Sequence, residues 1–290
     1  MKTFSEARTA AAGRVGLVPT MGFLHEGHLS LIERAVASAD TVIVSSYVNP
    51  LQFGAGEDLE RYPRNPDRDR ALIRAVGADI LFAPPLAEMY PEEPRVTVQV
   101  SGLTDDMEGA HRPGHFTGVA TVVTKLFAGL RPDLAFFGRK DAQQLAVVRR
   151  LARDLSFPVE IVGCPTVRES DGLALSSRNS YLGVHDREEA LGLSRGLMAA
   201  ADAIDGGELS GRILEGLAAA RSGLDLDYAE LRSQDDAARL DLLDRPAFLA
   251  VAATVGPARL IDNIHVDWVD GCPQVDRGRR LDHPSLIEEG

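Results

Sequence analysis

Short apolar runs alternate with longer amphipathic stretches from Arg14 to about Val167. The runs are rich in β-branched residues and predict strands, at Val15–Pro19, Thr41–Val48, Ile80–Ala83, Leu134–Phe137 and Val159–Val162. Between them, apolar residues recur with helical spacing, at Leu29–Ser38, Pro66–Val76, Phe116–Leu130 and Ala142–Leu155. This alternation is typical of an α/β domain with a parallel sheet, whose ligands bind at the carboxyl ends of the strands.

The pattern changes after about Ser177, where a long helical region precedes shorter apolar runs. The predicted elements are one helical region and three strands, at Asp186–Ser222, Asp225–Leu231, Ala247–Thr254 and Arg259–Ile264. The stretch Val266–Gly290 is charged, contains two prolines and lacks sustained periodicity, so we expect a flexible tail. The predicted organisation is an α/β domain over residues 1–175, a smaller α+β domain over 176–265 and a tail over 266–290.

Composition narrows the class of protein. Hydrophobic residues make up 44% and charged residues 26%, which is ordinary for a soluble globular chain. The net charge of −12 argues against broad nucleic-acid binding, so an anionic ligand needs a local basic pocket. The N-terminus lacks the apolar core of a signal peptide and no run resembles a membrane span, so we expect a cytoplasmic protein. Cys164 and Cys272 form neither a CxxC pair nor a disulfide framework.

The run Pro19–His28 follows the first predicted strand and places two imidazoles three residues apart at the predicted start of a helix. The free N–H groups and the dipole of a helix start favour a bound phosphate. His25 and His28 would share one helical face, and Gly27 would leave room for a ligand beside the backbone. The arrangement suits nucleotide phosphates. A zinc protease site is disfavoured because it needs histidines at i and i+4, whereas a packing role for the histidines stays open.

Two further segments follow predicted strands. Gln52 follows the second strand with an amide that can bind carboxylate or hydroxyl groups, although an ordinary Asn-Pro turn explains the same residues. Lys140 and Gln144 lie one helical turn apart after the fourth strand. Lys140 can reach a phosphate there, and a solvated surface charge is the alternative.

Two remaining clusters are less specific. Ser176, Ser177 and Arg178 place two hydroxyl groups and a guanidinium in a row, which suits a phosphate chain but also fits a plain helix cap. Asp67 and Asp69 open a predicted helix, where acidic residues commonly complement the dipole, so a metal role is the minor alternative.

Six segments in order resemble the motif set of the pantoate–beta-alanine ligase family, over about residues 1 to 265. They are Pro19–His28, Asn49–Gly54, Asp58–Arg64, His115–Phe127, Gly138–Gln144 and Pro165–Asn179. The family belongs to the nucleotidyltransferase-like enzymes with a Rossmann-like parallel sheet, and its HxGH sequence is matched by His25–His28. The resemblance implies a nucleotide- and pantoate-binding domain over 1–175 and a lid over 176–265. It also implies a homodimer, ATP as a substrate and Mg²⁺ as its companion.

The resemblance implies an activity and a role for each matched position. Pantoate attacks ATP to give pantoyl adenylate and pyrophosphate, and beta-alanine then displaces AMP. His28 would be the proton donor, assisted by His25, Lys140 and Arg178. Gln52 and Gln144 would bind pantoate, and Gln52 would also contact beta-alanine. The expected ATP contacts are Met21, Gly22, Phe23, Leu24, His25, Glu26, Gly27, His28, Gly138, Arg139, Lys140, Asp141, Val167, Leu175, Ser176, Ser177 and Arg178.

Some positions depart from the family pattern. The resemblance implies Glu where Arg139 stands, an aromatic residue at Ala142, Met at Leu175 and often an acidic residue at Arg68. Two other functions remain open. The first is a related nucleotidyltransferase acting on a phosphorylated or alcohol acceptor, and a phosphorylated acceptor would need a second cationic cluster in place of the two glutamines. A non-catalytic nucleotide sensor would bind ATP without releasing pyrophosphate.

Overall fold

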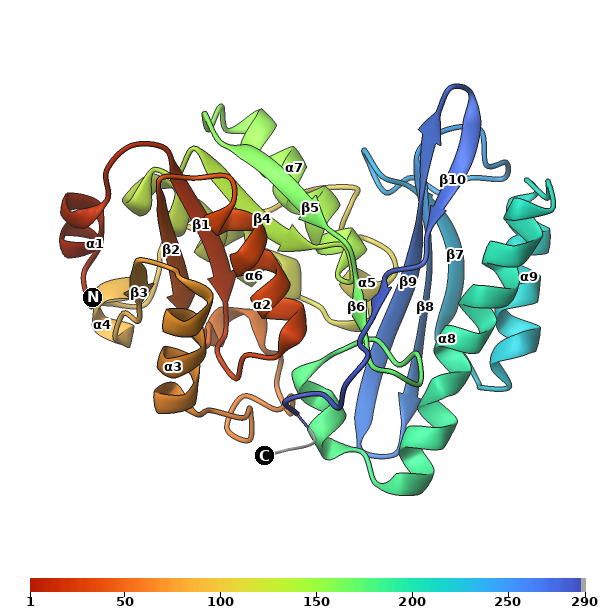
Figure 1. Ribbon diagram of the computed structural model, residues 1–290. Coiled ribbons are helices and arrows are strands. Elements are labelled where there is room, and N and C mark those ends of the chain that lie inside the picture. The colour runs from red at the N-terminus through yellow and green to blue at the C-terminus, as the bar shows by residue number, and fades with distance from the viewer. Residues whose placement is uncertain (288–290) are drawn as a thin grey trace. The chain divides into compact units, whose positions relative to one another are not determined.

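The computed structural model describes residues 1–287, which fold into two compact units (Figure 1). Unit 1 consists of Met1–Leu24, His28–Phe137 and Gln143–Cys164. Unit 2 consists of His25–Gly27, Gly138–Ala142 and the chain from Pro165 onward. The longest continuous part of unit 2 therefore begins at Pro165, whereas the sequence pattern predicts a domain boundary after residue 175.

Unit 1 is built on a parallel sheet with the strand order β3-β2-β1-β4-β5. Strand β1 pairs in parallel with β2 and β4, and β2 pairs in parallel with β3. The strands are β1 (Val15–Thr20), β2 (Thr41–Ser46), β3 (Ile80–Phe82), β4 (Leu134–Gly138) and β5 (Glu160–Cys164). The predicted Rossmann-like parallel sheet is confirmed.

Helices cover both faces of this sheet because successive residues of each strand point to opposite sides. Leu17 and Ile43 belong to one apolar cluster, together with residues of α1, α6 and α7. Val18 and Val44 belong to another, with residues of α2 and α3. The long helices are α2 (Glu26–Val36), α3 (Pro66–Val76), α6 (His115–Leu130) and α7 (Ala142–Asp154). Short helices occur at α1 (Phe4–Ala10), η1 (Pro50–Gln52), α4 (Leu86–Met89) and α5 (Glu108–His111).

Unit 2 contains an antiparallel sheet with the order β10-β9-β8-β7, against which α8 and α9 pack (Figure 1). Its strands are β7 (Tyr228–Ser233), β8 (Ala247–Val255), β9 (Ala258–Val269) and β10 (Cys272–Asp276). Helices α8 (Val184–Asp205) and α9 (Gly211–Ser222) approach closely, since a Cβ added at Gly196 would lie 2.3 Å from the Ala218 carbonyl oxygen. The predicted smaller α+β domain is confirmed in its fold class.

The stretch expected to be a tail contains regular structure instead. Residues 266–269 complete β9, β10 pairs antiparallel with β9, and β11 (Arg279–Arg280) pairs in parallel with β6 (Val167–Arg168). The side chains of Leu281 and Ile287 are buried. The expectation was wrong because these strands are short and β10 is an edge strand that accommodates Pro273, so no long periodicity develops. Residues 288–290 of the expected tail lie outside the described residues.

Candidate functional site

The loop after β1 in unit 1 is held by a buried carboxylate. Asp69, in the first turn of α3, accepts hydrogen bonds from the N–H groups of Phe23 and Leu24, both at 2.8 Å. Arg68 donates to the Leu24 carbonyl at 2.9 Å and stacks over the Phe23 ring. Phe23 has a φ of 51°, a left-handed conformation that needs such support. Asp69 therefore fixes the backbone of this expected ATP-binding loop, rather than only complementing the helix dipole.

His25 caps the helix that carries His28. Helix α2 begins at Glu26, so His25 precedes it and does not lie along its face as expected. The Gly27 N–H donates to His25 Nδ1 at 3.2 Å, and a Cβ at Gly27 would come within 2.9 Å of the imidazole. Because Nδ1 accepts this hydrogen bond, a neutral His25 carries its proton on Nε2. The ring is buried, and in this tautomer its Nε2–H group is the hydrogen-bond donor.

Gln52 and Met21, both expected at the site, lie together in unit 1. Gln52 Nε2 donates to Met21 Sδ at 3.1 Å, and Gln52 Oε1 accepts from Asn49 Nδ2 at 3.2 Å. The Asn49 side chain is itself held by Tyr90 Oη and by the Gly118 carbonyl. Sulfur is a weak acceptor, so Gln52 Nε2 can exchange this contact for a carboxylate oxygen with little loss.

His115 and Arg112 hold the backbone at Gln52. His115 Nδ1 donates to the Gln52 carbonyl at 2.9 Å, and Arg112 Nη1 donates to His115 Nε2 at 3.1 Å. Arg112 also forms a two-point ion pair with Glu57, at 2.9 and 2.7 Å. Burial and the Arg112 charge lower the pKa of His115 to about 4, so the imidazole is neutral near pH 7. No local pattern in the sequence indicates these roles, and only the motif His115–Phe127 marks the region.

The two adjacent glutamines of α7 differ in their surroundings. Gln143 is buried, accepts from the Glu108 N–H at 3.0 Å and donates to the carbonyls of Leu103 and Asp106 at 2.8 and 2.9 Å. Its amide is therefore used to hold the 103–108 loop. Gln144 is only partly buried, which leaves it the better candidate of the pair for binding a substrate.

In unit 2, strand β9 holds the backbone of the segment that carries Lys140. Asn263 Nδ2 donates to the Lys140 carbonyl at 2.5 Å, and His265 Nε2 donates to the Arg139 carbonyl at 3.0 Å. Burial lowers the pKa of His265 to about 4, which keeps this imidazole neutral. Lys140 Nζ lies 3.5 Å from Asp141 Oδ1.

Arg139 is engaged by carboxylates. Its Nη1 lies 2.9 Å from Asp267 Oδ2 and 3.1 Å from Asp276 Oδ2. Although burial opposes the effect, hydrogen bonds from Arg139 and Gln234 hold the pKa of Asp267 below its usual range. The guanidinium expected to contact ATP thus supports the loop beside Lys140.

The hydroxyl-rich cluster of unit 2 rests on buried charges. Ser176 Oγ accepts from the Arg178 N–H at 3.3 Å and caps η2 (Ser177–Tyr181). Asn179 Nδ2 donates to Glu169 Oε1 at 3.0 Å. Glu169 is buried and paired with Arg187 at 2.6 Å. The motif Pro165–Asn179 contains Glu169 but did not predict its role, because its partner Arg187 lies outside that motif. Asn263 and His265 lie in no motif, and Asp69 was expected only as a partner of the helix dipole or, less favoured, as a metal ligand.

The structure therefore divides the expected site residues into two groups. Unit 1 carries Met21–Leu24, Gln52, His28 and Gln144. Unit 2 carries His25–Gly27, Gly138–Asp141, Val167 and Leu175–Arg178. In unit 2, Leu175 Cβ lies 3.9 Å from the position of a Cβ at Gly27, so the first and last of these segments are neighbours.

Three general features of residues 1–287 bear on function. No helix in this part of the chain is long and apolar enough to cross a membrane. The same residues contain no group of three or more His, Cys, Asp or Glu side chains that could hold a metal ion. Neither Cys164, which is buried, nor Cys272, which is exposed, forms a disulfide.

Comparison with known proteins identifies relatives over most of the chain. The sequence model described as pantoate-beta-alanine ligase matches residues 1–265. The pantothenate synthetase of Chelativorans sp. (strain BNC1) is 52% identical over 277 residues, covering 91% of this chain and 96% of that protein.

Solved structures are also similar. A pantothenate synthetase from Thermus thermophilus has a TM-score of 0.87 and 49% identity, covering 91% of this chain and 97% of that one. The pantoate-beta-alanine ligase of Francisella tularensis, complexed with beta-gamma ATP and beta-alanine, has a TM-score of 0.71 and 32% identity, covering 91% and 95%. Because the family model matches residues 1–265, the chain belongs to the pantoate-beta-alanine ligase family.

Proposed function

We propose that the protein condenses pantoate with beta-alanine to pantothenate, consuming ATP and releasing pyrophosphate and AMP. The observation that carries this proposal is the family match over residues 1–265, which includes every segment expected to bind substrate. The Francisella tularensis relative complexed with a form of ATP and beta-alanine supports the same substrates.

The reaction has two steps. In the first, a pantoate carboxylate oxygen attacks the α-phosphorus of ATP, the bond to the bridging oxygen breaks and pyrophosphate leaves. In the second, the beta-alanine amine attacks the carbonyl carbon of pantoyl adenylate, loses a proton and expels AMP. Neither step needs a protein nucleophile, so positioning the reactants and stabilising the developing phosphate charge dominate catalysis.

Each proposed role follows from the chemistry of its side chain. His28 donates a hydrogen bond to the reacting phosphates, and His25 assists through its Nε2–H group because its Nδ1 is occupied by the Gly27 N–H. Lys140 and Arg178 supply positive charge along the phosphate chain. Gln52 and Gln144 bind the carboxylate and hydroxyl groups of pantoate, and Gln52 also contacts beta-alanine.

The other expected ATP contacts remain part of the proposal, with one change. The guanidinium of Arg139 pairs with two aspartates, so we assign Arg139 a supporting role beside Lys140. The remaining contacts are Met21, Gly22, Phe23, Leu24, Glu26, Gly27, Gly138, Asp141, Val167, Leu175, Ser176 and Ser177.

Mg²⁺ is proposed as the companion of ATP. Magnesium usually keeps several waters and binds through substrate phosphates with few protein carboxylates, which fits a chain whose described part has no ready-made metal cluster. When bound, the ion neutralises phosphate charge. A homodimer and a cytoplasmic location, both implied by the resemblance, stay predictions, and light scattering on the purified protein tests the first.

The decisive experiment measures pyrophosphate release from ATP and Mg²⁺ with and without pantoate, followed by addition of beta-alanine. Release that requires pantoate, with pantothenate formed only after beta-alanine, is the expected result. Saturable ATP binding without release would favour a nucleotide sensor. Release that requires a phosphorylated acceptor in place of pantoate would favour a related nucleotidyltransferase.

A further inference from the structure

We propose that the C-terminal segment from Val266 to Ile287 positions the ATP-binding loops of unit 2. This inference rests on the proposed function for the identity of those loops. The segment lies beyond the part of the chain that the family model matches, which ends at residue 265. It nevertheless contacts each of the three parts of unit 2 that carry expected ATP contacts.

The first contact supports the segment that carries Lys140. Both carboxylates that pair with Arg139 come from the C-terminal segment, Asp267 from β9 and Asp276 from the end of β10. The Arg139 side chain is only 18% exposed, so these ion pairs are partly shielded from water. They hold the residue directly before Lys140.

The identity of residue 139 agrees with this contact. The family resemblance implies Glu at this position, and a Glu beside Asp267 and Asp276 would bring three carboxylates together. Arg139 instead has the opposite charge to these two aspartates, which lie beyond the family-matched part of the chain. The residue that departs from the family pattern and the segment after residue 265 are therefore complementary in charge.

The second contact supports the strand and loop that lead to Arg178. Strand β11 pairs with β6, which contains Val167, and Leu281 and Ile287 share an apolar cluster with Val167 and Leu175. Ser285 is buried, and its Oγ donates to Glu169 Oε2 at 3.3 Å. Through its other oxygen, Glu169 holds Asn179.

The third contact reaches the histidine motif. The Leu286 N–H donates to Glu26 Oε1 at 2.8 Å, although 260 positions separate the two residues. Glu26 is the first residue of α2 and lies between His25 and Gly27. The C-terminal segment thus contacts Glu26, Arg139 and Glu169 within unit 2. A segment with these three contacts can fix the distances between the loops that carry them.

The first experiment reverses the charge of Arg139. Arg139→Glu should raise the dissociation constant for ATP by about fivefold or more, since loss of about 1 kcal/mol from a partly shielded ion pair corresponds to that change. Arg139→Glu combined with Asp276→Arg should recover most of this loss because an opposite pair is restored. The KM for pantoate should change less than twofold, roughly within measurement scatter.

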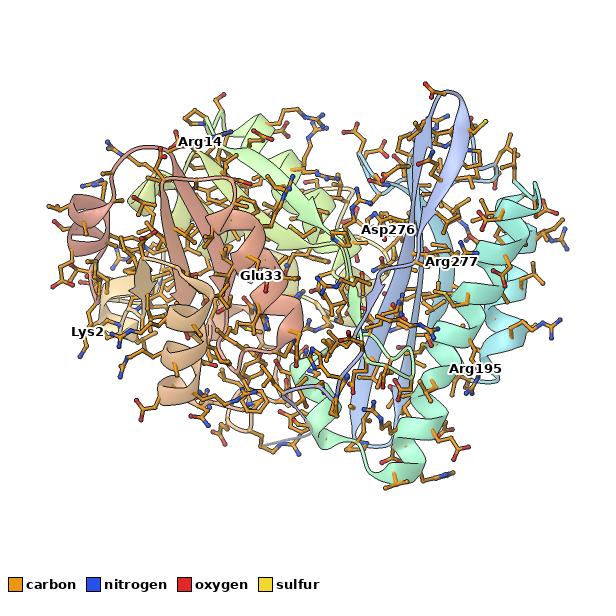
Figure 2. The ribbon with its side chains drawn as sticks, viewed as in Figure 1. Lys2, Arg14, Glu33, Arg195, Asp276 and Arg277 are labelled. Carbon is orange, nitrogen blue, oxygen red and sulfur yellow. The ribbon has the colours of Figure 1, made fainter. Side chains whose placement is uncertain are left out.

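A neighbouring residue provides the control. Arg277 follows Asp276 directly (Figure 2). Its side chain pairs with Asp202 and Asp205 of α8 rather than with a loop. Arg277→Ala should therefore leave ATP affinity unchanged. A fall in melting temperature for Arg139→Glu with unchanged ATP affinity, or no recovery in the double variant, would overturn the proposed positioning role.

The second experiment tests the far end of the segment without truncating it, because removal of β10 and β11 could unfold unit 2. Ser285→Ala should raise the KM for ATP by about twofold to fivefold, as expected for one hydrogen bond to a charged group that acts indirectly. Asp282→Ala is the matched control, since that side chain is 99% exposed. Equal KM values for both variants and the wild type would contradict the inference.

Binding measurements separate this inference from the proposed function. Titration with ATP alone reports loop positioning whether or not pantoate is the acceptor. Wild-type protein that binds ATP but forms no pantothenate would refute the proposed function, and the affinities of the variants would still decide the positioning role.

Discussion

Buried polar residues outside the sequence motifs hold the backbone of the motifs in position. Asp69 in unit 1, and Asn263 and His265 in unit 2, all bind backbone groups of expected ATP-binding segments. None of them needs to touch a ligand to matter. A backbone held in place by charged or neutral hydrogen bonds keeps its donors oriented before substrate binds, which reduces the entropy lost on binding.

Asp69→Asn tests this role at the residue scale. Asparagine can accept only one of the two backbone hydrogen bonds, and its amide group would face the other N–H. We expect a loss of about 1–3 kcal/mol in unfolding free energy and a higher KM for ATP. Asp67→Asn is the control, because its side chain is 90% exposed. Urea unfolding and initial rates measure both, and an unchanged KM for ATP would show that Asp69 does not act on the loop.

Gln144 and Gln143 form a matched pair with different expected effects. Gln144→Ala should weaken pantoate binding more than ATP binding, by roughly 1–3 kcal/mol for a lost hydrogen bond to a charged group. Gln143→Ala should mainly lower stability, because it leaves a buried N–H and two carbonyls without their partner. Separate KM values for the two substrates test this difference. Equal loss for both substrates in Gln144→Ala would indicate damage to the fold.

Two buried histidines make stability depend on pH. The pKa values of His115 and His265 are lowered from 6.5 to about 4, so below pH 6.5 the unfolded chain binds protons that the folded protein does not. Stability should be full above pH 6.5, fall as the pH decreases and level off near pH 4, by up to about 3 kcal/mol per histidine. Urea unfolding of His115→Gln should give a flatter profile in this window than that of exposed His283→Gln. Identical profiles would contradict the neutral state of His115.

At the scale of elements, periodicity located the long helices and the buried strands within a few residues. Helix α3 begins and ends where expected, at Pro66 and Val76, because Asn65 caps it and Gly77 ends it in a left-handed conformation. Strands β10 and β11 were missed. They are short, and β11 exists through pairing with β6, more than a hundred residues earlier, which no local pattern can report.

The packing of α8 on α9 supports a prediction about stability. A methyl group at Gly196 would lie 2.3 Å from the Ala218 carbonyl oxygen, so Gly196→Ala should force the helices apart and lower stability by about 1–3 kcal/mol. Gly216→Ala, in α9, meets no atom within 4 Å and should raise stability by up to about 1 kcal/mol through helix propensity. Thermal unfolding of the two variants gives opposite shifts if the contact is as close as described. A stabilising effect of both would contradict it.

At the scale of the whole molecule, the candidate site was partly predictable. The sequence motifs, read through the family resemblance, named the residues expected to meet ATP and pantoate. These residues are divided between two units, and one boundary falls inside the histidine motif, after Gly27. The sequence could not predict this division, because it depends on contacts with distant parts of the chain. Glu26 and the segment Gly138–Ala142 make those contacts. The same limit applies to the C-terminal segment, whose partners are spread over unit 2.

The position of His28 leads to a prediction about the two half-reactions. His25 to Gly27 belong to unit 2, whereas His28 belongs to unit 1 and lies within α2. Replacing His28 with Ala keeps the hydrogen bond by which His25 caps α2 and the contact of Glu26, and it removes the proposed donor to the reacting phosphates. We expect pyrophosphate release to fall by roughly 10²–10³-fold, as for loss of one transition-state donor, with ATP affinity little changed.

The second half-reaction provides the internal comparison for His28→Ala. Formation of pantothenate from supplied pantoyl adenylate and beta-alanine needs no phosphoryl displacement, so it should be much less affected than pyrophosphate release. His185→Ala is the control, since that histidine is exposed on α8. Normal pyrophosphate release by His28→Ala would remove His28 from the mechanism. A donor that acts only in the transition state of pyrophosphate release should slow that half-reaction alone. Equal loss in both half-reactions would therefore mean that His28 maintains the structure around α2.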